Sequence, residues 1–170
     1  MAAEIRLHVF TGTDASTDGG SAASFSFLSI DSAADDQSAR VSNPISIPSS
    51  GCAYSYEKWI SACVSVAPDN NVSNFQVWGS PPGQAFPAGT CWLVGTAPYG
   101  SGSTPTDTSS SIATSSLADA TSGAKYTWDS ASYAAAGSMT RYLVMQLQVE
   151  ASASPGDWGP CDLNYSYDEV

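Results

Sequence analysis

Charged residues are scarce in this sequence, and basic residues are the scarcest. Only 12% of the 170 residues are charged, and 5 Lys and Arg against 16 Asp and Glu give a formal net charge of −11 at pH 7. The basic residues are scattered along the chain: Arg6, Arg40, Lys58, Lys125 and Arg141. Phosphate binding needs clustered cations, so the sequence argues against a nucleic-acid partner. The acidic excess favours a protein that keeps apart from anionic neighbours.

Histidine is limited to a single residue, His8. It alternates with Ile5, Leu7 and Val9, so we expect it to point away from the face that those residues form. A histidine that acts as a general base needs an orienting carboxylate and a nucleophile, and the sequence around His8 supplies neither. The chain also has no nucleophile elbow, zinc-protease, P-loop or dinucleotide-binding motif. We therefore expect no enzymatic activity and no cofactor.

Long apolar runs are missing as well. No stretch approaches the roughly 20 apolar residues that a transmembrane helix needs. The start of the chain, MAAEIRLHVF, lacks the charged and apolar regions of a signal peptide. The sequence thus predicts no membrane partner and a chain that matures in a cytoplasm.

Metal-binding cysteine motifs are absent, although the chain contains cysteine. Cys52, Cys63, Cys91 and Cys161 include no CxxC pair and have no neighbouring histidine, which argues against a zinc site. Such a set allows three full disulfide pairings, and the alternative is four buried or half-buried thiols. We favour thiols, since a chain of this length buries enough surface to fold without disulfides.

Loop carboxylates gather at two places. Asp14 and Asp18 lie in one loop, and Asp31, Asp35 and Asp36 lie in another, DSAADD. Calcium takes six to eight oxygen ligands, but this spacing does not match an EF-hand loop. We interpret these residues as solvated turn residues and expect no metal site, with calcium binding as the alternative.

A period-2 pattern is the strongest signal that the sequence does contain. Residues 141–151, RYLVMQLQVEA, place Leu143, Met145, Leu147 and Val149 on one face. That face is expected in the core, and the opposite face in water or against a partner. Shorter patterns predict further strands at 4–10, 24–30, 59–67, 72–79, 90–97, 125–129 and 163–170.

Loops rich in Gly, Pro, Ser and Asp separate these short strands, and no segment forms a long amphipathic helix. This organisation predicts an all-β fold, an antiparallel β-sandwich for which a jelly-roll arrangement is one form. We expect a single domain over 1–170, with an N-terminal arm and a C-terminal strand. The low-complexity stretch 99–111 is expected to be a surface excursion.

Residues 43–66 are patterned as a corner followed by a strand. Pro44 and Pro48 interrupt any ladder of backbone hydrogen bonds, and Gly51 permits a sharp change of direction. Aromatic residues then anchor the strand that follows. We predict that the chain crosses from one sheet to the other here.

Aromatic residues make up 11% of the chain and fall into two groups. Four tryptophans lie in or beside predicted strands and are expected to pack in the core or at its rim: Trp59, Trp78, Trp92 and Trp128. Trp158 and Tyr99 lie in loops. Exposed aromatic residues in sandwich loops stack on sugars or anchor a protein partner. Packing in the core or at an oligomer contact is the interpretation that we favour, and the alternative is that these two are contact residues for a sugar or a protein partner.

Proline and aromatic residues mark five stretches of the chain. They are NPISIPSSGCAYSYEKWISACVSV (43–66), VSNFQVWGSPPG (72–83), TCWLVGTAPYG (90–100), YLVMQLQVEASASPGDW (142–158) and NYSYDEV (164–170). Together they resemble a group of small structural proteins from the virions of tailed bacteriophages. The resemblance spans residues 4–170 and rests on these dispersed signatures rather than on a catalytic motif.

The resemblance implies a capsid decoration (cement) protein that binds the outside of the phage head and stabilises the junctions between capsomers. It implies the major capsid protein as partner, a homotrimer, and a location on the outer capsid surface after synthesis in the host cytoplasm. The candidate partner-binding residues are Trp158, Tyr99, Tyr165 and Tyr167. The alternatives are a tail or neck structural protein of the same virion and a carbohydrate-binding β-sandwich module.

Overall fold

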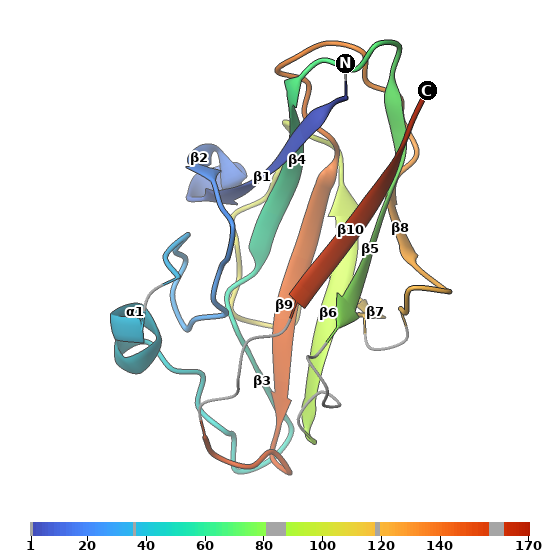
Figure 1. The fold of residues 1–170 in the computed structure, drawn as a ribbon. Helices are drawn as coiled ribbons and strands as arrows, with labels where there is room; N and C mark the ends of the chain where they lie inside the picture. The colour runs from blue at the N-terminus through green and yellow to red at the C-terminus, as the bar shows by residue number, and fades with distance from the viewer. Residues whose placement is uncertain (1, 36, 81–87, 118–119, 157–161) are drawn as a thin grey trace.

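The chain folds into two antiparallel β-sheets packed face to face (Figure 1). A computed structural model describes residues 2–35, 37–80, 88–117, 120–156 and 162–170. Strands dominate the described residues, and the helical pieces are short. The predicted all-β sandwich is therefore confirmed.

The larger sheet, sheet A, has the strand order β2-β1-β4-β9-β6-β7, with β3 also paired to β9. Its strands are β1 (Glu4–Thr11), β2 (Thr17–Ser21), β3 (Cys52–Tyr54), β4 (Lys58–Val66), β6 (Thr90–Ala97), β7 (Ser115–Ser116) and β9 (Tyr142–Glu150). The smaller sheet, sheet B, has the order β10-β5-β8. Its strands are β5 (Val72–Ser80), β8 (Tyr126–Asp129) and β10 (Asp162–Glu169), and the helical pieces are η1 (Thr13–Ala15) and α1 (Gln37–Ser42).

The period-2 pattern locates most of these strands. The predictions at 4–10, 59–67, 72–79, 90–97, 125–129, 141–151 and 163–170 coincide with β1, β4, β5, β6, β8, β9 and β10. The prediction at 24–30 is wrong, because that stretch contains no strand. Strands β2, β3 and β7 and helix α1 were not predicted.

The main core lies between the sheets, on what we call the inner face of sheet A. Both sheets contribute buried residues to it: Val9, Ile60, Ala62, Val64, Val72, Phe75, Val77, Val94, Trp128, Leu143 and Met145. In sheet B, the ring of Phe75 meets that of Trp128 edge to face, with centroids 6.1 Å apart. Leu143 and Met145 therefore face the core, as the alternation in 141–151 predicted.

The opposite, outer face of β9, which we predicted to be wet or covered by a partner, is not wet, because it is buried as well. Tyr142, Val144 and Gln146 are at most 3% exposed. Residues 98–114, here called the outer segment, cover this face. The Gln146 amide group donates to the carbonyls of Thr106 (3.2 Å) and Thr108 (2.8 Å). The stretch 99–111 thus lies at the surface as predicted, with most of its residues exposed, and it is fixed to sheet A by hydrogen bonds to the buried Gln146.

Residues 43–66 do not cross between the sheets, contrary to our prediction. Both β3 and β4 pair with β9, so the segment stays in sheet A. Between them, Ser55 keeps the contact to β9: its N–H donates to the Leu147 carbonyl (2.9 Å), and its Oγ accepts from the Leu147 N–H (3.0 Å). Gly51, with a φ of 69°, makes the expected turn before β3.

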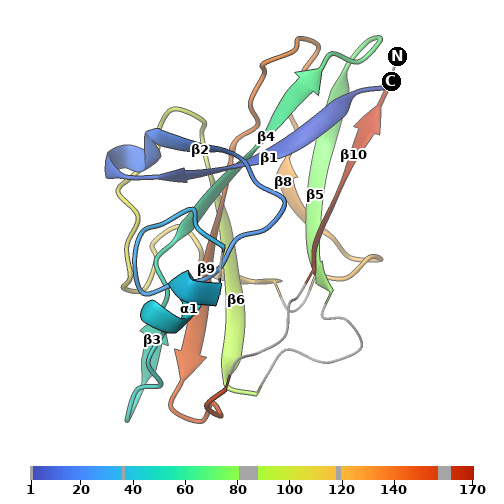
Figure 2. The same cartoon turned by 60° about the vertical axis from the view of Figure 1, so that its left-hand side comes forward.

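The two ends of the chain lie together at one end of the sandwich (Figures 1 and 2). The Ala3 N–H donates to Oε1 of Glu169 at 2.8 Å. The first residues of β6 and the last residues of β9 lie at the opposite end of the sandwich.

Candidate functional site

Sheet A extends past the end of sheet B, and this difference creates a cleft. Leu143 and Met145 lie beneath sheet B, whereas Leu147 and Val149, further along the same face, belong to a separate cluster. Partly buried side chains from elsewhere pack against that cluster: Phe27, Ile45, Ile47 and Trp92. Residues 22–47, here called the inner segment, therefore close part of the inner face that sheet B leaves uncovered (Figure 2).

A cleft of 1090 Å³ remains between the inner segment, sheet A and the start of β10. The inner segment contributes Ala22 to Phe27, Asp35, Arg40, Val41 and residues 44–47 to its lining. Sheet A contributes Leu7, Val9, Ile60, Thr90, Trp92, Leu147 and Val149, and the chain around β10 contributes Ser154, Pro155, Gly156, Asp162 and Leu163. Its volume is at the upper end of the range for small-molecule sites.

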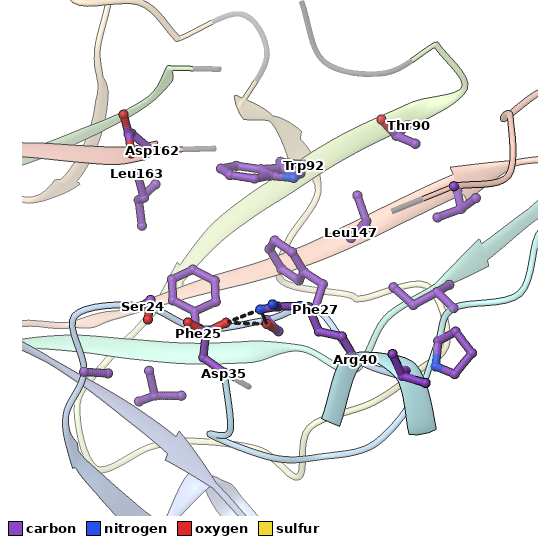
Figure 3. A pocket seen from close by; sticks show the side chains of 18 of the residues that line it. Ser24, Phe25, Phe27, Asp35, Arg40, Thr90, Trp92, Leu147, Asp162 and Leu163 are labelled. Atoms are coloured by element: carbon purple, nitrogen blue, oxygen red, sulfur yellow. Dashed lines mark hydrogen bonds and ion pairs between the residues drawn. The ribbon is translucent and has the colours of Figure 1, made fainter. Parts of the chain in front are cut away.

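Aromatic rings form one corner of the cleft. Figure 3 shows Phe25, Phe27 and Trp92 around its interior, opposite Leu163 of β10. The centroids of Phe25 and Phe27 are 5.6 Å apart in an edge-to-face arrangement. Phe27 and Trp92 are also 5.6 Å apart, with their planes at 55°. The rings thus pack on one another and do not form a flat platform.

A small polar group on the inner segment faces the same space. Arg40 donates to Oδ1 of Asp35 at 3.1 Å, and Ser26 donates to the same oxygen (Figure 3). Burial raises the pKa of Asp35, but hydrogen bonds from Ser24 and Ser26 and the charge of Arg40 outweigh it, so the net pKa is lowered. Asp35 is therefore an ionised, internally paired carboxylate.

A buried lysine ties the inner segment to sheet A. Lys58 of β4 is 1% exposed, and its Nζ donates to the carbonyl of Ser32. Burial lowers the pKa of Lys58 to about 8, and the charge of Asp31 offsets part of this effect. Asp31 in turn accepts a hydrogen bond from the N–H of Gly12 at 2.6 Å. Asp31 and Ser32 thus join the inner segment to both β4 and the turn after β1.

Tyr99 lies on the other side of sheet A, away from the cleft. It is 46% exposed, and its ring packs on Tyr142 with centroids 5.2 Å apart. Trp158 lies outside the described residues. The carbohydrate platform predicted from Trp158 and Tyr99 is therefore not tested, and the role of Tyr99 in partner binding stays a prediction.

Tyr165 and Tyr167 lie on β10 and point inward. The Tyr165 hydroxyl donates to the Ile5 carbonyl at 3.4 Å, and burial raises its pKa. The ring of Tyr167 stacks on Phe75, with centroids 5.7 Å apart. Both side chains thus serve the contact between the sheets, and the structure does not bring them together with Tyr99. Their part in partner binding stays a prediction.

The candidate metal ligands and cysteines stay apart from one another. Within the described residues, no group of three or more His, Cys, Asp and Glu side chains is placed to hold a metal ion. Asp36 and Cys161 lie outside those residues. Cys52, Cys63 and Cys91 are free thiols, and Cys52 is the exposed one.

His8 has a carboxylate partner that its sequence neighbours do not reveal. Its Nδ1 lies 3.0 Å from both Oδ1 and Oδ2 of Asp18. The turn between β1 and β2 brings the two residues together, because His8 pairs with Ser21 in this hairpin. Asp18 therefore has a structural partner and is not a free turn residue.

The residues of the cleft were not identified from the sequence. Phe25 and Phe27 alternate with serines, and this pattern predicted a strand. In the structure, the backbone there makes isolated hydrogen bonds, such as Tyr56 N–H to the Leu28 carbonyl (2.9 Å) and Ser29 N–H to the Asn43 carbonyl (3.1 Å). The alternation still places both rings on one side, toward the cleft.

Comparison with known proteins gives no match: no protein-family model, curated protein or solved structure is significantly similar to the chain. Among the described residues, no helix has the length and apolar character needed to cross a membrane. The cleft is thus defined by its own geometry, and its role must be argued from the residues that line it.

Proposed function

We propose that this chain is a non-enzymatic structural protein of a tailed-phage virion. It binds the outside of the head as a decoration protein, with the major capsid protein as partner, and stabilises the junctions between capsomers. The observation that carries the proposal is the resemblance over residues 4–170. The stretches that carry it supply most of the sandwich, including β4, β5, β6, β9 and β10, so the likeness concerns the scaffold.

The packing of sheet A supports a structural role. Its central strand β9 is covered on the inner face by sheet B and on the outer face by the outer segment. A doubly covered sheet resists deformation, which suits a protein that holds neighbouring subunits in place. A decoration protein stabilises the assembled lattice by binding it and not its free subunits, and a trimer would add avidity.

The distribution of cations supports a protein partner over a nucleic acid. Arg6 pairs with Glu4 at 2.6 Å and Arg40 with Asp35 at 3.1 Å. Lys58 is buried, and Lys125 lies over the ring of Trp78, 4.9 Å from its centroid. Few positive charges are therefore left to contact phosphates.

Electron cryomicroscopy of the intact virion tests the proposal. We expect density for the sandwich on the outer shell at capsomer junctions, in hundreds of copies. A few copies at the neck or tail would instead identify a tail or neck protein. Absence from the particle would overturn a virion role altogether.

A further inference from the structure

The cleft is elongated across sheet A. Its floor includes Leu7 of β1, Ile60 of β4, Leu147 of β9 and Trp92 of β6, which belong to four adjacent strands. Three inter-strand spacings of about 4.8 Å give a length of about 14 Å, which matches about four residues of an extended peptide. The shape suits a strand-like segment.

The lining favours apolar side chains over a sugar. Apolar residues make up most of the floor, and the aromatic rings of Phe25, Phe27 and Trp92 pack edge to face or tilted on one another. A sugar stacks on a flat, exposed ring face, and these rings do not offer one. Alternate apolar side chains of an extended segment would instead fit between them.

The start of β10 adds an open strand edge and a negative charge. Among the described strands, β10 pairs with β5 alone, so its other edge is left open beside the cleft. Among the described residues, the charged ones that line the cleft are Asp35, Arg40 and Asp162. Asp35 and Arg40 are paired, whereas Asp162 is exposed and its side-chain carboxylate forms no hydrogen bond or ion pair with any described residue. The unpaired charge at this end of the cleft is therefore negative.

We propose that the cleft binds an extended segment of a partner protein, with alternating apolar side chains and a Lys or Arg that meets Asp162. This inference rests on the proposed function, because it describes the capsid segment that the protein would recognise. A second copy of this chain is a poor occupant, since its cations are few and most of them are already paired, buried or packed on a ring.

Selection from a random heptapeptide library on the immobilised protein tests the inference. Ala23 is exposed and lines the cleft, so Ala23→Trp should block it. Ala134 is exposed and does not line it, so Ala134→Trp is the matched control. We expect enriched peptides to combine alternating apolar residues with Lys or Arg, and to lose binding at least tenfold on Ala23→Trp only. Asp162→Asn should weaken binding by about threefold, as for an exposed ion pair.

Three results would overturn the inference. They are no enrichment, equal binding to Ala23→Trp and the parent, or enrichment of acidic peptides. Maltohexaose binding that shifts the NMR amide signals of Thr90 and Trp92 would assign the cleft to a glycan instead.

Testing whether the parent and Ala23→Trp decorate phage heads distinguishes a failure of this inference from a failure of the proposed function. If Ala23→Trp decorates the head as well as the parent does, the cleft is not the capsid contact, and the proposed function stands. If the parent does not decorate the particle, the proposed function fails, and the peptide selection alone decides what the cleft binds.

Discussion

Two irregular segments cover sheet A, and they pack against it at very different distances. The outer segment approaches so closely that a Cβ built on Gly95 would lie 1.9 Å from the Ile112 carbonyl oxygen. The inner segment meets the sheet through aromatic and aliphatic side chains and leaves a cleft of 1090 Å³. Both segments are rich in small polar residues, so composition alone does not set the distance.

The size and bonding of a few contact residues explain the difference. On the outer face, Gly95 offers no side chain and Gln146 reaches three backbone carbonyls, so the backbone of the outer segment can lie on the sheet. On the inner face, the rings of Phe25, Phe27 and Trp92 lie between the inner segment and the sheet and act as spacers. The close contact leaves no space above the outer face, and the open one leaves the cleft.

Removing the buried amide group of Gln146 should lower the stability of the fold more than any other change considered below. Gln146→Leu takes the donor away from the carbonyls of Ser55, Thr106 and Thr108. Buried groups that lose their partner cost about 1–3 kcal/mol, and we expect a loss of about 3 kcal/mol in the free energy of unfolding, measured by urea denaturation. Gln148→Leu is the control, because Gln148 is only partly buried and bonds to the Cys52 sulfur alone. Equal losses would mean that the outer segment is not held through Gln146.

Adding one methyl group at Gly95 should be the next most damaging change. In Gly95→Ala the new Cβ meets the backbone of Ile112, so the outer segment must lift from the sheet. We expect a loss of about 2–3 kcal/mol, as for overpacked sites, and faster hydrogen exchange in residues 98–114. Gly123→Ala should change little, since the nearest atom to its Cβ is a side-chain oxygen of Thr121 at 3.9 Å. A harmless Gly95→Ala would refute the close approach.

Lys58, which anchors the inner segment to sheet A, should make the stability of the fold depend on pH, with an effect of intermediate size. Between the folded pKa of Lys58, about 8, and its ordinary value of 10.5, the unfolded chain holds a proton that the folded chain has lost, so stability rises with pH. We expect a gain of about 1–2 kcal/mol from pH 8 to 9.5 in urea denaturation, and no such gain in Lys58→Met.

Tyrosines set the upper limit of this pH window. Burial raises the pKa of Tyr126, Tyr142 and Tyr165 above the ordinary value of 10.0. The folded chain then keeps protons that the unfolded chain loses, so stability falls again above pH 10. Burial also raises the pKa of Cys63, which opposes the gain from Lys58 in both proteins, so identical profiles of the parent and Lys58→Met from pH 8 to 9.5 would show that Lys58 is not buried as described.

Filling the cleft should have the smallest effect on stability. Ala23→Trp adds its ring to open space, and we expect a change below about 0.5 kcal/mol, typical of surface sites. On the outer side, Ala113 is only 1% exposed. Ala113→Trp therefore has no space for its ring and should lower the free energy of unfolding by about 3 kcal/mol. Thermal denaturation of the two variants compares the segments directly, and similar melting temperatures would contradict the difference in packing.

The sequence predicts the sheets better than it predicts their covers. Alternation in 141–151 correctly placed Leu143 and Met145 in the core, because a strand has a fixed period. It could not show that Gln146 would be buried, because its partners lie 36 to 40 residues away in the outer segment and 91 residues away at Ser55.

The cleft was missed for a similar reason. Phe25 and Phe27 carry the alternation of a strand, but a strand also needs a neighbour to pair with, and the local sequence does not say whether one exists. Strand β2, TDGGS, shows the converse case. It has little strand propensity, and it forms because the turn after β1 folds it back onto that strand.

The two ends of the chain lie next to each other, joined by the hydrogen bond from Ala3 to Glu169. They therefore distinguish one pole of the sandwich from the other. A fluorophore, affinity tag or fused enzyme attached at either end would project from the same pole of the sandwich. The first residues of β6 and the last residues of β9, which help to line the cleft, lie toward the other pole. The two ends of the sandwich thus differ, because one holds both chain ends and the other holds part of the cleft.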